Sequence, residues 1–251
     1  MNNKGHETMT AMVGTVLRAA RGSALPAIWC ALLTVAVLVG GCARVIDGAP
    51  RAGERAAPPA RLVPIADLLI EPTRFPAHYP AAVLPPKDID RVLGEIDGVP
   101  AGSEVTPPEC APLPLLGTER AAAQGSDDDS GTRLIVTVVR PVPSVHARAA
   151  QLAECPSFTV TSMDDPDDVS TVTVKLPPPP PVDADDSYAV DQAVTSETDQ
   201  SVTKTLTFVA LLGDVRVTAS WQASSDAEPD ATTLDTLFST AVLKVRRAVP
   251  R

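Results

Sequence analysis

A two-residue turn at Gly213-Asp214, set between two apolar segments, constrains this chain more than any other local feature. A Gly-Asp turn with β-branched and apolar residues on both sides is a strong signal for a β-hairpin. The turn fixes the register, so Leu206 faces Trp221 and Leu212 faces Val215 on one side. That side is apolar throughout and the other side is mixed, which predicts a sheet covered on one face.

An amphipathic helix is predicted directly after the hairpin, where it can cover the apolar side. Its apolar residues recur at helical spacing; they are Leu234, Leu237, Phe238, Ala241, Val242 and Val245. Thr232 and Asp235 resemble a capping box at the start of this helix. The sequence therefore predicts that the C-terminal hairpin and the covering helix after it form the core.

Shorter patterns upstream complete the predicted domain. Helices are expected at 65–70, 87–96 and 145–154, and strands at 134–139, 158–162 and 172–176. Residues 177–202 begin with five prolines and continue with polar residues, so we predict a mobile Pro-rich and acidic insertion there. The order of elements predicts an α+β fold, in which an antiparallel β-sheet has helices packed on one face.

The first 41 residues have the pattern of a lipoprotein signal peptide. Arg18 and Arg21 precede an apolar run of about 16 residues. The alternative interpretation is an ordinary membrane helix, but such a helix requires roughly 20 apolar residues. The run ends in Gly40-Gly41-Cys42, which matches a bacterial lipobox. We expect cleavage before Cys42, lipidation of its thiol with acyl chains such as palmitate, and a location on the outer face of the cell membrane.

Residues 42–61 are rich in Ala, Pro and Arg, which predicts a flexible tether between the lipidated Cys42 and the folded part. Residues 62–251 are expected to form a single extracytoplasmic domain. The chain has 21 basic and 31 acidic residues, and such an acidic balance repels phosphate backbones. The expected partner is therefore the membrane, through the lipid anchor, and not a nucleic acid.

Two cysteines, Cys110 and Cys155, remain once Cys30 leaves with the signal peptide and Cys42 carries lipid. An even pair in an oxidising compartment most simply forms a disulfide. Two unpaired buried thiols are the alternative. A redox or metal role has less support, because the sequence contains no Cys-x-x-Cys motif and few histidines.

Motifs for catalysis and metal binding are scarce. His78 and His146 are the only histidines outside the signal peptide, and no Gly-x-Ser-x-Gly or His-Glu-x-x-His motif accompanies them. Acidic clusters at 127–129, 164–168 and 183–186 lack the EF-hand spacing, so solvated loops are the first interpretation and calcium binding the alternative. We expect no catalytic residue, no metal, no cofactor and no enzyme activity.

Several segments resemble uncharacterised cell-envelope lipoproteins of mycobacteria and other actinobacteria, a family that holds a domain of unknown function. They are Leu38-Val39-Gly40-Gly41-Cys42, Asp67-Leu68-Leu69, Phe75-Pro76, Pro108-Glu109-Cys110-Ala111-Pro112, Cys155 and Trp221. The layout is similar, more distantly, to the extracellular sensor domain of a mycobacterial serine/threonine kinase, an α+β module with a cleft. That domain has two disulfides, whereas this chain has one candidate.

The resemblance implies a sensor-like module that binds a small molecule, a lipid or an envelope protein. The alternative function is a lipid carrier with a deep apolar cavity, and a hydrolase has less support. The apolar side of the hairpin is already taken by the last helix, which favours the binding module. The size of the cavity between sheet and helices should distinguish the two.

Overall fold

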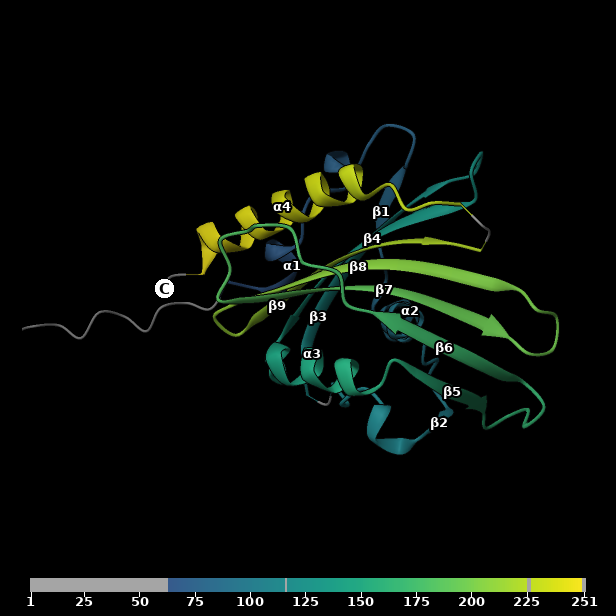
Figure 1. Ribbon diagram of the computed structural model, residues 1–251. Coiled ribbons are helices and arrows are strands. Elements are labelled where there is room, and N and C mark those ends of the chain that lie inside the picture. Colours follow the sequence, from purple (N-terminus) through teal and green to yellow (C-terminus); the bar gives the residue numbers. More distant parts are fainter. Residues whose placement is uncertain (1–62, 116, 225–226, 250–251) are drawn as a thin grey trace, which may run out of the picture. The chain divides into compact units, whose positions relative to one another are not determined.

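The computed structural model describes residues 63–115, 117–224 and 227–249, which form one antiparallel sheet with α-helices on it (Figure 1). The described strands are β1 (Ala81–Val83), β2 (Ser103–Thr106), β3 (Glu119–Asp127), β4 (Thr132–Arg140), β5 (Ser157–Ser162), β6 (Val169–Lys175), β7 (Asp186–Ser196), β8 (Val202–Leu212) and β9 (Val215–Ala223). Their order across the sheet is β1-β3-β4-β9-β8-β7-β6-β5-β2.

The described helices are α1 (Ile65–Leu68), α2 (Pro86–Asp97), α3 (Val145–Glu154) and α4 (Ala231–Ala248), with short 3-10 turns η1 (Pro72–Arg74) and η2 (Pro108–Cys110). Within this part of the chain, no helix has the length and hydropathy that would let it cross a membrane. The predicted signal peptide (1–41), the lipidated Cys42 and the tether (42–61) lie outside the described residues.

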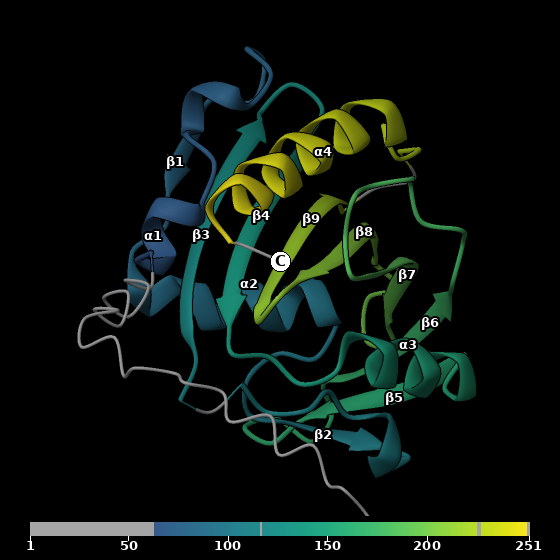
Figure 2. The ribbon, with the colours of Figure 1, turned by 90° about the vertical axis from the view of Figure 1, so that its left-hand side faces the viewer.

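The hairpin of β8 and β9 has the predicted register, with Leu206 opposite Trp221 and Leu212 opposite Val215. Helix α4 lies across its apolar side, with α1 beside it (Figure 2). Phe238 of α4 is fully buried in the cluster that also holds Trp221. The α+β class, the antiparallel sheet and the covering C-terminal helix are therefore confirmed.

Helices cover both faces of the sheet, where one covered face was predicted (Figure 1). Ile135 and Val139 of β4 point away from α4 and pack against α2, through Ile96 and Ile89 respectively. Leu152 of α3 packs on the same second face, in a cluster with residues of β5, β6 and β7. The reason is that β4 is apolar on both sides, so each side has to be buried.

The prediction of a mobile insertion at 177–202 is wrong for residues 186–196, which form strand β7. This strand pairs with β6 on one side and β8 on the other. Its composition is polar, but Tyr188, Val190 and Val194 alternate toward the second face and pack there. Pairing on both edges therefore stabilises a segment whose local sequence favours a loop.

One strand was not predicted, and the start of one helix differs from the prediction. Strand β3 holds three alanines and a glycine, which have low β-propensity, and it forms because β1 and β4 pair with it on either side. Helix α4 begins after Asp230, whose carboxylate accepts a hydrogen bond from the Thr233 N–H at 3.0 Å. Asp230, and not the predicted Thr232, is thus the N-cap.

Candidate functional site

A row of polar side chains crosses the centre of the second face. The register aligns Gln192 of β7, Thr205 of β8, Gln222 of β9 and Arg133 of β4 as direct cross-strand neighbours. The two glutamines and Thr205 are buried, with Gln222 only 1% exposed. The mixed side of the hairpin is therefore an interior surface, and its polar residues are withdrawn from bulk water.

These buried side chains leave polar atoms without partners. In the described parts of the chain, both amide atoms of Gln222, the Nε2 of Gln192 and the Oγ1 of Thr205 form no hydrogen bond. A buried donor or acceptor without a partner costs about 1–3 kcal/mol, so each such group calls for a partner, which a water or a bound ligand can supply. Because Gln192, Thr205 and Gln222 are neighbours in one row, these unpartnered polar atoms are concentrated in one place of the fold.

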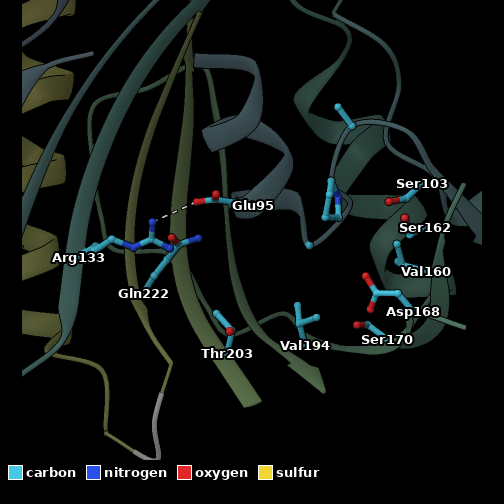
Figure 3. A pocket seen from close by; sticks show the side chains of 13 residues that line it. Glu95, Ser103, Arg133, Val160, Ser162, Asp168, Ser170, Val194, Thr203 and Gln222 are labelled. Atoms are coloured by element: carbon cyan, nitrogen blue, oxygen red, sulfur yellow. Dashed lines mark hydrogen bonds and ion pairs between the residues drawn. The ribbon is translucent and has the colours of Figure 1, made fainter. Parts of the chain in front are cut away.

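A cleft of about 350 Å³ opens directly in front of Gln222. Figure 3 shows its two walls, Arg133, Gln222 and Thr203 on one side and Val160, Ser162, Asp168 and Ser170 on the other. The end of α2 and the segment that follows, with Glu95, Gly98, Pro100, Ala101 and Ser103, complete the lining, and Val194 of β7 lies between the walls. The cleft is thus built from strands on both sides of β7.

The charged groups of the inner cleft are already paired. Arg133 donates to Glu95 at 3.2 Å, and Glu95 also binds Arg91 one turn earlier on α2. Helix α2 holds Glu95 in place because its buried stripe, which includes Val92 and Ile96, packs on the sheet. Asp168 is exposed at the rim. The buried part of the cleft therefore offers amide and hydroxyl groups without unbalanced charge.

Gly98 brings α2 close to the polar row. It caps the helix in the left-handed region, with φ of 68°, which glycine adopts at little cost. A Cβ at this position would come within 2.4 Å of the Nε2 of Gln192. Any larger residue at position 98 would displace either the end of α2 or the Gln192 amide.

A second hollow, of about 460 Å³, lies between the α1–η1 region and the end of α4. Two of its charged residues pair with each other, since Lys244 donates to Glu71 at 2.7 Å. None of the buried side-chain atoms that lack a partner in the described residues belongs to it. The cleft at Gln222 is the better candidate for this reason.

The predicted disulfide is confirmed. Cys110 and Cys155 are bonded, with their Cα atoms 5.7 Å apart, and the bond joins η2 to the end of α3. Neither cysteine lines the cleft. The bond holds η2 against the end of α3. Cys42, the predicted lipidation site, lies outside the described residues.

His78 and His146 lie on separate elements and are both exposed. The ring of His78 lies beside that of Tyr79, tilted by 50° with centroids 4.6 Å apart, and His146 lies in the first turn of α3. Neither lines the cleft. The two histidines therefore lie on different parts of the fold and outside the cleft.

The acidic clusters at 127–129 and 164–168 form local turns, whereas Asp185 of the third cluster pairs with Arg246 of α4 at 3.1 Å. Asp127 accepts hydrogen bonds from Ser130 and from the Asp129 N–H, and Asp165 accepts from the Asp167 N–H. Among residues 63–115, 117–224 and 227–249, no three His, Cys, Asp or Glu side chains converge as metal ligands. Asp168 alone of these clusters reaches the cleft.

The sequence did not identify Gln222, Gln192 or Arg133. A signal was present, since Thr205, Thr207, Ser220 and Gln222 recur on the mixed side of the hairpin. Alternation places these residues together, but an exposed sheet face would show the same pattern. The positions of α2 and α3 over that side convert it into an interior.

A family profile described as "Domain of unknown function (DUF5642)" matches residues 65–246, which is the part of the chain that holds the sheet and its helices. This chain belongs to the DUF5642 family. The DUF5642 match includes both halves of the cleft, from Glu95 to Gln222. The predicted membership of a family with a domain of unknown function is confirmed.

Two solved structures resemble this DUF5642 protein. One is an uncharacterized protein from Mycobacterium smegmatis, the ortholog of Rv0999, with a TM-score of 0.46 and 18% identity over 74% of this chain and 99% of that one. The other is the extracellular domain of PknH from Mycobacterium tuberculosis, with a TM-score of 0.39 and 15% identity over 68% and 96%. No curated protein matches the sequence. At this similarity no residue role is transferred.

Proposed function

We propose that this DUF5642 protein is a lipid-anchored, extracytoplasmic binding module of the cell envelope, and that it holds a small polar ligand by an uncharged amide group at Gln222. The anchor rests on the lipobox ending in Cys42. The binding role rests on one observation, namely that both amide atoms of the buried Gln222 lack partners and line a cleft.

The chemistry of the cleft selects the ligand class. A glutamine amide presents one acceptor and an NH₂ donor side by side, and another primary amide, which presents the same two groups, can bond to both. An anion is disfavoured, because Glu95 and the exposed Asp168 are the carboxylates of the lining and the one arginine, Arg133, is already paired. The volume of about 350 Å³ is within the range of small-molecule sites, about 300–1,000 Å³.

A lipid carrier is supported less well. Its cavity would need apolar walls, whereas the floor of this cleft carries Gln222 and its rim carries Ser103, Ser162 and Ser170. The main apolar side of the sheet is filled by α4 through Phe238. Binding without catalysis also agrees with the lining, which holds neither a histidine nor a cysteine.

A matched pair of compounds tests the proposal. N-acetylglycinamide is neutral and carries a secondary and a primary amide. N-acetylglycine has nearly the same shape and keeps the secondary amide, but it has a carboxylate in place of the primary one. In ¹H–¹⁵N spectra of the purified protein, the amide compound should shift the side-chain NH₂ signal of Gln222 and the acid should not. A response to both compounds equally, or to neither, contradicts the proposal.

Gln222→Met tests the residue itself, because methionine keeps the length and removes the amide. We expect binding of N-acetylglycinamide to be lost while the melting temperature stays the same or rises, since the unpaired polar atoms are removed. Gln124→Met is the matched control. Gln124 is another strand glutamine with an unpartnered atom, but it does not line the cleft. Loss of binding in both variants would indicate a general effect on folding.

A further inference from the structure

Two small cavities of about 30 Å³ each lie farther along the second face, away from Gln222. Four residues line both of them, namely Asp97 at the end of α2, Arg148 of α3, Tyr188 of β7 and Arg216 of β9. The shared residues show that the two cavities adjoin. Each cavity is large enough for a small polar group and too small for a whole ligand.

Arg216 forms no ion pair with any of the described residues. No carboxylate oxygen among them lies within 4.0 Å of its guanidinium, and its buried Nε has no hydrogen-bond acceptor there. Arg120 makes the contrast, because it occupies the same cross-strand row on the far side of Val139 and pairs with Asp90. In a chain of net charge −10, a partly buried arginine without an anion is unexpected.

The charged residues that line the two cavities, Arg148, Arg216 and Asp97, leave one positive charge over. Arg148 lies 3.8 Å from Asp97, and it also donates to the Gln151 side chain at 2.6 Å and to the Cys110 carbonyl at 3.3 Å. The charge of Arg148 is thus balanced by Asp97. Asp186 lies two strands away in the same cross-strand row. No described carboxylate oxygen comes within 4.0 Å of Arg216, so an anion entering here would meet an unpaired guanidinium.

Two more features favour an anion. Burial raises the pKa of Tyr188 to about 12, so its hydroxyl stays protonated and can donate a hydrogen bond. The N-terminal end of α3 borders one cavity through Ser144 and Val145, and its first turn contains no acidic residue. The free N–H groups and the dipole of a helix start attract negative charge.

We propose that these adjoining cavities form a binding site for one anionic oxygen group, a carboxylate or a phosphate, with Arg216 as its main ligand and Arg148 and Tyr188 beside it. The planar guanidinium of arginine can donate two parallel hydrogen bonds to either group. The site is separate from the Gln222 cleft, and the proposal of an anion here does not depend on the ligand proposed for that cleft.

The test follows the Nε–H signals of the arginines in ¹H–¹⁵N spectra of the purified protein. Inorganic phosphate and sodium acetate are titrated separately, with sodium chloride keeping the ionic strength constant. We expect the Arg216 signal to shift and saturate while the Arg120 signal stays in place. Response to phosphate alone, to acetate alone or to both identifies which anion the site accepts. No saturable shift at Arg216 with either anion, or equal shifts at Arg120, overturns the proposal.

Arg216→Gln removes the charge and keeps a polar side chain. We expect the affinity for the responding anion to fall about tenfold or more, because hydrogen bonds to charged groups contribute strongly. Arg120→Gln, in the same row, should leave the affinity unchanged. Unchanged affinity in Arg216→Gln overturns the proposal. If that variant does not fold, the comparison of Arg216 and Arg120 signals in the unaltered protein decides.

Discussion

Phe208 of β8 and Phe238 of α4 meet edge to face, with ring centroids 5.7 Å apart and ring planes inclined by 60°. This contact joins the hairpin to the helix that covers it, and both residues belong to the largest buried cluster of the described chain. Edge-to-face aromatic pairs add stabilisation beyond the area that they bury. The pair therefore lies at the contact between the β8–β9 hairpin and helix α4, the two elements that the sequence predicted best.

Phe238→Ala should destabilise the protein severely. Truncating a buried phenylalanine typically costs about 3–5 kcal/mol, out of a total stability of about 5–15 kcal/mol. Leu243→Ala is the control, since Leu243 lies on the same helix and is 52% exposed. Denaturant unfolding should show a large loss for the first variant and little for the second. Similar midpoints for both would place the core elsewhere.

Removing the disulfide should lower stability as well. Cys110 and Cys155 close a loop with a sequence separation of 45, for which the chain-entropy model gives about 4 kcal/mol. The double variant Cys110→Ala/Cys155→Ala should therefore unfold at clearly lower denaturant concentration. Adding a reductant should shift the unaltered protein in the same direction and leave the double variant unchanged. A reductant effect on the double variant would point to another cause.

Asp230 should give α4 a stability that is lost in acid. Hydrogen bonds from Thr233 lower the pKa of the Asp230 carboxyl below its ordinary value. A group with a lowered folded pKa stabilises the fold fully above its unfolded pKa, about 3.9, and the benefit disappears as the pH falls below it. Asp230→Asn keeps an acceptor at the N-cap, so it should reduce this acid dependence with a small effect at neutral pH.

Asp230→Ala separates capping from charge. It removes the acceptor at every pH, and losing an N-cap typically costs about 1 kcal/mol. Unfolding curves measured from pH 7 to pH 3 for the three proteins should show a uniform loss for the alanine variant and a flattened acid limb for both variants. Parallel curves for the unaltered protein and Asp230→Asn would contradict the assignment.

Cys42→Ala should release the protein from the membrane. The lipobox interpretation makes the thiol of Cys42 the only attachment point that we propose, and a free thiol group is required for acylation. Fractionation of cells that express the variant should move it from the membrane to the soluble fraction. Retention in the membrane, with residues 1–41 still attached, would favour an uncleaved membrane helix instead.

The sequence determined those elements whose signal is local. The Gly213-Asp214 turn set the register of β8 and β9, and alternation then put Leu206 and Trp221 on one side. Helical spacing identified α4, and the parity of the cysteines identified the disulfide. In each case neighbours in the chain, or a single covalent pairing, supply the deciding constraint.

Tertiary structure decided the rest. Strand β7 has a polar sequence and is ordered by the two strands that pair with it, so no short segment could reveal it. The interior character of Gln222, and the lack of a counter-ion at Arg216, depend on α2 and α3 covering the second face. A polar residue in an alternating strand gives the same sequence pattern whether water or a helix covers it. Burial is decided by how distant segments pack, and the local sequence does not show it.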